Sequence, residues 1–409
     1  MLVPGSWRKI RVGGQKWLSC MVSDNTLKRI TEQFKLAAPV YVTRPRMPEL
    51  SAYTRCLERI WESRWLTNDG QFHQQFEHEL KAYLGIEHLN LFVNGTIALM
   101  VALQSLRINS GEVITTPFTF PATSHVLHWN RTKPVYCDIE ERTFNIDASK
   151  IEKLISPDTK AIMAVHVYGN PCDVEAIQAI ADRHGLYVIY DAAHAFGVRI
   201  ADTSVMNFGD ISAMSFHATK LFSSIEGGAL APRSAELRNR IQYLRNFGIA
   251  DAETVIGPGI NGKMNEFQAS FGLLELEIVD DEIMRRQTLA NLYRRLLADV
   301  PGITCLADLP RVRHNYSYFP VLIDPDAFGV SRNALSEILQ ECNIYTRKYF
   351  YPLCSNYPCY AALPSSAPEH LPVANRTANR VLCLPLYGEL DGEIVETACA
   401  IIAAIAAYR

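Results

Sequence analysis

The chain has 409 residues, of which 48% are hydrophobic, so it is long enough to form one large and one smaller domain with well-packed cores. Its formal charge is −3, from 40 basic and 43 acidic side chains, and no basic block stands out. Nucleic-acid and membrane-surface binding are therefore disfavoured. No apolar run reaches the roughly 20 residues that span a bilayer. The ten cysteines form no CxxC pair, which favours reduced thiols and a cytoplasmic location.

The N-terminal residues 1–39 are expected to form a dispensable extension. The first 17 residues carry basic side chains but no following apolar core, so they are not a secretory signal, and Met21 is a second candidate start. We expect residues 40–285 to form the large domain with an N-terminal arm. A smaller C-terminal α+β domain is expected over residues 286–409.

Short β-branched runs alternate with helical stretches from about residue 71 to 278, a pattern that predicts a mostly parallel sheet with helices on both faces. The clearest strands are 112–115, 161–165 and 187–190, and a helix over 174–185 connects the last two. Each strand ends in polar or turn residues. Because open α/β sheets bind ligands at the carboxyl ends of their strands, we expect these loops to converge on one crevice.

Asn94-Gly95-Thr96 follows a predicted strand over 89–93 and opens a helix. Backbone N–H groups at a helix start, together with the Thr96 hydroxyl, suit a phosphate. Taken alone, an Asn-Gly before a helix is more often a turn and a cap. Phe120 lies just past the next strand end, where its ring could stack on a flat ligand or simply belong to the core.

Lys220 and Asp191 carry the strongest chemical signal in the chain. Asp191 ends a strand, and Lys220 follows 29 positions later, just ahead of a glycine pair at 227–228. This pattern is typical of pyridoxal 5′-phosphate (PLP) enzymes, in which the lysine forms the Schiff base and the carboxylate pairs with the protonated pyridine nitrogen. Ser215 can donate to the phosphate from the turn that carries Lys220. With Lys220 and Asp191 present, the phosphate interpretation of Gly95 and Thr96 is favoured.

Two histidines near these residues have open interpretations. His194 could support the Asp191 carboxylate or contact the ring, or it could be a partly buried histidine at a helix start. His217 could line a sugar pocket or simply pack. A metal site is not expected, because the histidines and cysteines show no ligand spacing.

These blocks resemble the nucleotide-sugar aminotransferases of the DegT/DnrJ/EryC1/StrS family, which have the PLP-dependent transferase fold type I. The resemblance covers residue 40 to the C-terminus and includes seven ordered blocks: 65–70, 94–99, 119–123, 166–171, 191–197, 215–220 and 259–266. It implies a large domain with a mostly parallel sheet, a smaller α+β domain and PLP as the cofactor.

The resemblance also implies roles for individual residues. The cofactor-binding set has the phosphate on Gly95, Thr96 and Ser215, Phe120 on the ring face, Asp191 on the ring nitrogen, His194 beside the ring, and the partner subunit's cofactor phosphate on Asn261. A homodimer with shared active sites follows. Asn261 lies in a glycine-flanked loop 41 residues past Lys220, which we expect to reach the partner's phosphate turn rather than its own. Further candidate substrate contacts are His217, Lys263, Arg347 and Tyr349.

Lys263 marks a departure from the family pattern, since many relatives carry an arginine there. A lysine presents a point charge in place of a bidentate fork. One branch of the family is most similar in four segments, 215–220, 226–229, 259–266 and 347–353. Enzymes of that branch aminate C4 of dTDP-4-keto-6-deoxy-D-glucose with L-glutamate, giving dTDP-4-amino-4,6-dideoxy-D-glucose and 2-oxoglutarate. That branch implies a place in O-antigen or lipopolysaccharide biosynthesis.

Two alternatives remain at this point. The substrate could be another keto sugar, namely GDP-4-keto-6-deoxymannose, a 3-keto sugar or a UDP-linked sugar. The protein could be a non-catalytic PLP-fold regulator, which the intact Lys220, Asp191 and Phe120 disfavour. A dehydrating subclass of the family has histidine in place of the lysine, and Lys220 excludes it.

Overall fold

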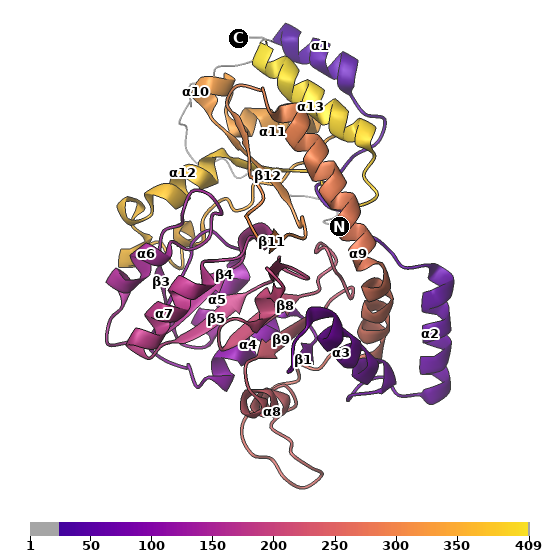
Figure 1. Ribbon diagram of the computed structural model, residues 1–409, viewed down its shortest axis with the longest axis vertical. Helices are drawn as coiled ribbons and strands as arrows, with labels where there is room; N and C mark the ends of the chain where they lie inside the picture. Colours follow the sequence, from indigo (N-terminus) through magenta and orange to yellow (C-terminus); the bar gives the residue numbers. More distant parts are fainter. Residues whose placement is uncertain (1–23, 408–409) are drawn as a thin grey trace.

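The computed structural model describes residues 24–407, which form a large and a small domain connected by the 32-residue helix α9 (Glu266–Leu297) (Figure 1). The predicted start at Met21 and Cys20 lie outside the described residues. The expected domain boundary at residues 285–286 falls inside α9, so one continuous helix belongs to both domains. Within residues 24–407, no helix is both long and apolar enough to cross a membrane.

A seven-stranded sheet forms the centre of the large domain, in the order β1-β9-β8-β5-β4-β2-β3. All strands run in one direction except β9, which pairs antiparallel with both of its neighbours. The predicted strands correspond to β2, β4 and β5. The seven strands are β1 (Asn90–Phe92), β2 (Glu112–Thr115), β3 (Lys133–Tyr136), β4 (Thr159–Val165), β5 (Tyr187–Asp191), β8 (Ile211–Ser215) and β9 (Gly228–Pro232).

Helices cover both faces of this sheet. In β4, Ala161 and Met163 face one buried cluster, which includes side chains of α4, α5 and α8, whereas Ile162 and Ala164 face another cluster, which includes α7. Successive residues of a strand point to opposite faces, so a strand covered on both sides is apolar at every position. The helices of the large domain are α2 (Leu50–Ser63), α3 (Gln71–Leu84), α4 (Gly95–Ser105), α5 (Pro121–Trp129), α6 (Ala148–Ile151), α7 (Val174–His184) and α8 (Ala235–Leu244).

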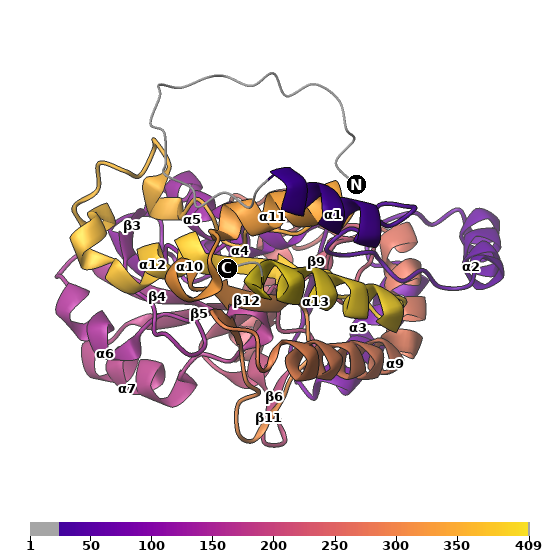
Figure 2. The ribbon, with the colours of Figure 1, turned by 90° about the horizontal axis from the view of Figure 1, so that it is seen from above.

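The small domain contains an antiparallel sheet in the order β10-β12-β13. A third sheet, β11-β6-β7, connects the domains because β11 comes from the small one. Figure 2 shows its strands β6 and β11 projecting from one side of the molecule. The remaining elements are β6 (Arg199–Ile200), β7 (Thr203–Ser204), β10 (Ile303–Cys305), β11 (Val312–Arg313), β12 (Phe319–Ile323), β13 (Val381–Leu384), α10 (Pro325–Phe328), α11 (Arg332–Glu341), α12 (Pro372–Arg380) and α13 (Gly392–Ala407).

The first described residues belong to the small domain. Helix α1 (Asp24–Phe34) lies against α13, as both ribbon views show, and Ile30 is buried in the core there (Figures 1 and 2). The Leu36 N–H donates to the Cys342 carbonyl, and Val40 forms a parallel bridge with Ile344. Part of the extension predicted over residues 1–39 is therefore packed structure. Its dispensability stays a prediction.

Candidate active site

The carboxyl ends of the parallel strands lie at one edge of the large sheet and carry most of the predicted site residues. Gly95 follows β1, Asp191 ends β5 and Ser215 ends β8. The loop after β8 returns as β9, and its backbone bonds from Phe216 to Gly227 and from Ala218 to Ile225 hold it as a closed turn. Lys220 sits in this turn, where its N–H donates to the His217 carbonyl at 2.8 Å.

Lys220 is a partly buried amine with an altered acidity. Burial lowers the pKa of Lys220 to about 8, although the nearby Asp191 carboxylate acts in the opposite direction. At neutral pH a larger share of the amine is therefore unprotonated than in an exposed lysine. An unprotonated amine is the form that attacks a carbonyl carbon, as a Schiff-base lysine must.

Asp191 is a buried carboxylate with two donors. Oδ2 accepts a hydrogen bond of 2.8 Å from the Thr123 hydroxyl, and Oδ1 accepts one of 3.1 Å from the Ala193 N–H. Burial raises the pKa of Asp191, whereas these hydrogen bonds and the positive charge of Lys220 oppose that shift. The Thr123 hydroxyl also lies 2.8 Å from that of Thr119.

His194 is enclosed by aromatic side chains. Its ring lies parallel to Tyr168 and Phe350, with interplanar angles of 2° and 3°, and meets Tyr318 edge-on at 4.9 Å. Nδ1 accepts the Tyr168 N–H at 3.2 Å, which places any proton of the neutral ring on Nε2. Burial and the charge of Lys220 hold the pKa of His194 well below its ordinary value. A neutral ring beside Asp191 and Lys220 can pack against a flat ligand.

The turn after β1 approaches the end of β8 closely. Asn94 caps helix α4 by accepting the Ile97 N–H at 2.9 Å, which leaves the Thr96 side chain exposed. A β-carbon added at Gly95 would lie 2.8 Å from the Ser215 β-carbon, and one added at Gly228 would lie 2.7 Å from the Gly95 nitrogen. Glycine is thus required at both positions. The result is a small cradle of N–H groups and hydroxyls at a helix N-terminus, which suits a phosphate.

Phe120 lies at the N-terminus of α5 with 53% of its surface exposed, so it is not the core aromatic that its sequence context also allowed. The loop before it is held by the small domain, because the Cys354 N–H donates to the Pro117 carbonyl at 3.0 Å. An exposed ring next to Thr119 and the Asp191 hydrogen-bond partners is available to a flat ligand. Stacking of Phe120 on the cofactor ring stays a prediction.

Three of the predicted substrate residues come from two segments, and Lys263 lies in a third. His217 contacts the Thr219 hydroxyl through Nδ1 at 2.8 Å and lies 3.5 Å from the Glu226 carboxylate, so it faces its own turn. Arg347 stacks on the Tyr349 ring at 5.8 Å. Tyr349 in turn meets Tyr318 edge-on, which connects this small-domain pair with the aromatic side chains around His194.

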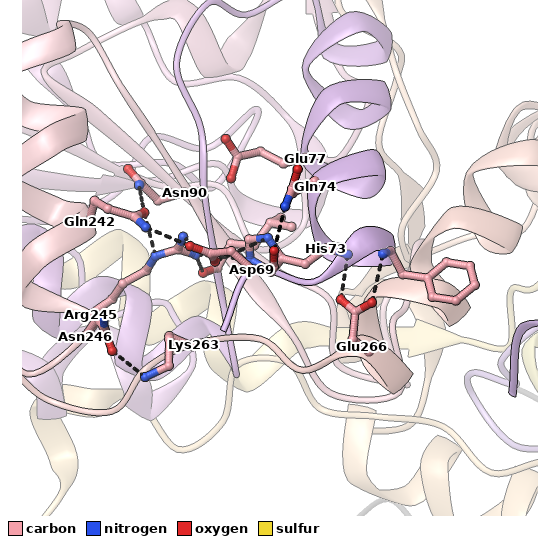
Figure 3. Close-up of polar contacts among 12 residues, drawn as sticks. Asp69, His73, Gln74, Glu77, Asn90, Gln242, Arg245, Asn246, Lys263 and Glu266 are labelled. Atoms are coloured by element: carbon pink, nitrogen blue, oxygen red, sulfur yellow. Dashed lines mark hydrogen bonds and ion pairs between the residues drawn. The ribbon is translucent and has the colours of Figure 1, made fainter. Parts of the chain in front are cut away.

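Lys263 lies in a polar cluster beside the large sheet (Figure 3), and Asn261 is hydrogen-bonded to it. Lys263 Nζ donates to Asn246 at 2.6 Å and to Asn261 Oδ1 at 3.1 Å. No carboxylate of the described residues lies within ion-pair distance of that ammonium. Next to them, the buried Arg245 guanidinium pairs with Asp69 at 3.2 Å.

The expectation that this loop is poorly placed to approach its own phosphate turn is wrong at Gly262, whereas the contact of Asn261 with a partner's cofactor phosphate stays a prediction. The Gly262 carbonyl accepts the Val93 N–H at 2.9 Å, and a β-carbon at Gly262 would lie 3.0 Å from the Ile97 side chain. The loop is thus held against the start of α4 in its own chain. Sequence separation from Lys220 gave no information on this contact, because β1 and the residues after α8 are adjacent only in the folded sheet.

Sequence reasoning missed several residues around the site. Thr119 and Thr123 contact Asp191 or each other, and Tyr168, Tyr318 and Phe350 enclose His194. The sequence did point to Thr119 and Thr123, since both lie with Phe120 in the 119–123 block that carries the family resemblance. Tyr168 and Phe350 also lie in segments that carry the family resemblance, 166–171 and 347–353, whereas nothing in the sequence pointed to Tyr318. No group of three metal-ligating side chains occurs within residues 24–407.

The residues present fit PLP. A partly buried lysine with a lowered pKa, a buried carboxylate and a glycine-lined helix N-terminus meet at one sheet edge, and they match the aldehyde, ring nitrogen and phosphate of that group. Among these residues, Lys220 would hold the cofactor covalently and Asp191 would face its ring nitrogen.

Comparison with known proteins agrees with this assignment. Residues 51–403 match the model of the DegT/DnrJ/EryC1/StrS aminotransferase family. The chain is 50% identical to a dTDP-4-amino-4,6-dideoxy-D-glucose transaminase of Escherichia coli, over 87% of this chain and 95% of that protein. A transaminase of the same name from Shigella dysenteriae is 45% identical, over 88% and 96%.

A solved structure is similar over the same range. The crystal structure of DesI in the presence of its TDP-sugar product superposes with a TM-score of 0.86 at 33% identity, covering 91% of this chain and 94% of that one. The predicted fold type I is therefore confirmed. The chain belongs to the DegT/DnrJ/EryC1/StrS aminotransferase family and is a PLP-dependent sugar aminotransferase.

Proposed function

We propose that the enzyme transfers the amino group of L-glutamate to the C4 ketone of dTDP-4-keto-6-deoxy-D-glucose, giving dTDP-4-amino-4,6-dideoxy-D-glucose and 2-oxoglutarate. The observation that carries this proposal is the 50% identity, over nearly the full length of both chains, to a transaminase named for that amino sugar. The Lys220 and Asp191 pair supports turnover and disfavours a purely regulatory role. Free cysteines among the described residues are compatible with work in the cytoplasm.

The chain's own residues divide the chemistry among them. When bound, PLP supplies an electrophilic carbon and a ring that accepts electrons. Lys220 Nζ, once free as an amine, would be the base that takes the proton from the glutamate α-carbon and later delivers one to C4 of the sugar. Asp191 holds the proton on the ring nitrogen. The N–H groups at Gly95 and the hydroxyls of Thr96 and Ser215 hold the phosphate.

A homodimer with shared sites is the second part of the proposal. The segment between α8 and α9 projects from the large domain (Figure 1) and carries exposed apolar side chains. The exposed fractions are 49% for Phe247, 39% for Ile249, 66% for Val255, 58% for Ile256 and 39% for Ile260. Such a surface favours contact with another copy of the chain. Asn261 then donates from the edge of this segment to the partner's phosphate.

Lys263 supports the same arrangement. Its ammonium donates to two amide oxygens, and burial followed by repulsion from Arg245 lowers the pKa of Lys263. Since Asn261 Oδ1 accepts from Lys263, the Asn261 NH₂ group is left as a donor for a phosphate oxygen. An anion at this place would also compensate the charge of Lys263. The sugar diphosphate and the partner's cofactor phosphate are the anions that the reaction provides.

The substrate is tested by incubating the pure protein with PLP, L-glutamate and a panel of nucleotide-linked keto sugars, with product identified by mass and NMR. The Lys220→Ala variant is the inactive control for this assay. We expect the highest kcat/KM with the dTDP-linked 4-keto-6-deoxy sugar. A higher value with a GDP-linked, UDP-linked or 3-keto sugar would overturn the substrate assignment. Failure of L-glutamate to bleach the absorbance of the bound cofactor would favour the regulatory alternative.

A further inference from the structure

Two buried threonines form a hydroxyl chain that ends on Asp191. The Thr119 and Thr123 side-chain oxygens lie 2.8 Å apart, and the Thr123 hydroxyl lies 2.8 Å from Asp191 Oδ2. Both threonines are buried, with 1% and 0% of their surface exposed. This pair of hydroxyl groups connects the N-terminus of α5 to the end of β5, and Thr123 and Asp191 are 68 residues apart in sequence.

The direction of these hydrogen bonds follows from the chemistry of the groups. An ionised carboxylate can only accept, so the single Thr123 proton points to Asp191. Thr119 must therefore donate to Thr123, whose oxygen is left as an acceptor. A threonine inside a helix often bonds to a backbone carbonyl one turn earlier. The Thr123 hydroxyl instead contacts two side chains, those of Thr119 and Asp191.

The small domain holds Thr119, the first of the two threonines, in place. The Cys354 thiol donates to the Thr119 carbonyl at 3.3 Å, and the Cys354 N–H donates to the Pro117 carbonyl at 3.0 Å. The Thr119 backbone is therefore fixed from outside the large sheet. On the other oxygen of Asp191, the Ala193 N–H completes the set of donors at 3.1 Å.

We propose that Thr123, oriented by Thr119, is a positioning residue that keeps the Asp191 carboxylate ionised and fixed in orientation for the cofactor's ring nitrogen. The reason is the competition at Asp191. Burial disfavours the anion, and the charge of Lys220 and the two donors favour it, while the nearby His194 stays neutral. Without the hydroxyl, the proton shared between carboxylate and ring moves toward the carboxylate, and the ring accepts electrons less well. This inference rests on the proposed role of Asp191.

The test compares Thr123→Val, Thr123→Ser and the matched control Thr115→Val. Thr115 is equally buried and donates to the Met163 carbonyl at 2.8 Å, so its loss removes one internal hydrogen bond without touching Asp191. A hydrogen bond to a charged group is strong enough to change an equilibrium by about tenfold or more. We expect Thr123→Val to lower kcat by at least that factor at nearly constant KM, with Thr123→Ser close to wild type.

Two spectroscopic readouts separate positioning from folding. With ¹⁵N-labelled PLP, the ring-nitrogen signal should move toward neutral pyridine in Thr123→Val and stay at pyridinium in Thr115→Val. In the protein without cofactor, ¹³C NMR of labelled aspartate should show a higher pKa for Asp191 in Thr123→Val than in wild type. A ring nitrogen that stays protonated, or an unchanged Asp191 pKa, would overturn the proposal.

Further variants cover the remaining outcomes. If Thr123→Val does not fold, Thr119→Val should shift the same signals in the same direction by a smaller amount, and a result equal to Thr115→Val would overturn the proposal. Asp191→Asn separates a failure of the proposed role of Thr123 from a failure of the proposed role of Asp191. If Asp191→Asn is inactive while Thr123→Val is normal, only the threonine inference fails. If Asp191→Asn keeps full activity, the proposed role of Asp191 fails first.

Discussion

Gly95 and Ser215 lie so close together that the turn after β1 and the end of β8 leave no room for a β-carbon. An alanine at Gly95 would place its β-carbon 2.8 Å from that of Ser215, closer than two carbon atoms approach in a packed protein. Two strand ends that are distant in sequence thus form one wall of the proposed phosphate cradle.

Gly95→Ala is therefore expected to weaken PLP binding. The forced displacement of Ser215 should cost about 1–3 kcal/mol and separate the hydroxyl from the helix N-terminus. The matched control is Gly392→Ala, which also changes the first residue of a helix but meets only the Leu292 side chain, at 3.7 Å. Cofactor affinity, measured by fluorescence titration of the protein without cofactor, should fall in the first variant alone. Equal affinities would remove Gly95 from the phosphate site.

Asp191→Asn should keep the fold and lose most of the activity, because an amide cannot hold the proton of the ring nitrogen. Asp210→Asn is the control. The Asp210 carboxylate accepts the Val188 N–H at 2.8 Å near the beginning of strands β5 and β8, whereas Asp191 lies at the end of β5. PLP content and kcat are measured for both. Normal kcat with normal PLP content in Asp191→Asn would show that the ring nitrogen is paired elsewhere.

The reaction of the cofactor-free protein with PLP should have a midpoint near the lowered pKa of Lys220, about 8. The neutral amine is the reacting form, and its fraction rises with pH through that value, so the rate should increase up to about pH 8 and level off above it. Stopped-flow absorbance measures this profile, and Lys220→Ala provides the baseline. A midpoint near the ordinary lysine pKa, about 10.4, would contradict the burial of this amine.

Activity should return when two inactive chains are mixed. Lys220→Ala keeps Asn261, and Asn261→Asp keeps Lys220, so a heterodimer contains one site with both residues intact. Each variant is assayed alone and after subunit exchange, with heterodimers verified by native mass spectrometry through two different tags. Recovery of activity supports the shared site. A mixture that contains heterodimers but stays inactive, or a fully active monomer in sedimentation, would defeat it.

Glu275→Gln should stabilise the protein near neutral pH. Burial, followed by repulsion from Glu282, raises the pKa of Glu275 to about 8, and Glu275 Oε1 has no partner among the described residues. The folded state thus binds a proton that the unfolded state releases above about pH 4.3. The stability that this proton contributes is fully present below that pH and is lost as the pH rises to about 8.

Glutamine keeps the neutral form at every pH, so the gain in Tm should be small at pH 5 and reach a few degrees at pH 8. The control is Glu277→Gln, an exposed residue on the same helix. Differential scanning calorimetry at both pH values measures the effect. A gain that is equal at pH 5 and pH 8 would show that Glu275 does not titrate in this window.

Local patterns predicted the central sheet because both faces of it are buried. The runs at 161–165 and 187–190 are apolar or aromatic throughout, the run at 112–115 is apolar at its centre, and each is followed by polar or turn residues. The same pattern therefore predicted both the strands and the sheet edge at which the site lies. The same holds for Lys220 and Asp191, whose pairing in the site follows from adjacent parallel strands β5 and β8.

Long-range packing could not be predicted in this way. Phe350 and Tyr318 reach His194 from the small domain. The hydrophobic pattern of a segment indicates which of its faces is buried, but not which distant residue it packs against. The loop at Gly262 contacts Val93 because an antiparallel strand, β9, is inserted beside β1. Sequence distance therefore gave no information on the Gly262 contact, and the role of Asn261 stays a prediction. Thr123 was overlooked because a threonine near a helix start ordinarily serves as a cap.

The packing of α1 against α13 determines when the chain can finish folding during its synthesis. Residues 24–42 leave the ribosome well before the partners of Ile30 and Val40, which lie in α13 and at Ile344. The large sheet is complete at β9, long before those partners emerge. Domains generally form as units during translation. The small domain can therefore be completed only after α13 has been synthesised, when the large sheet has long been available to fold.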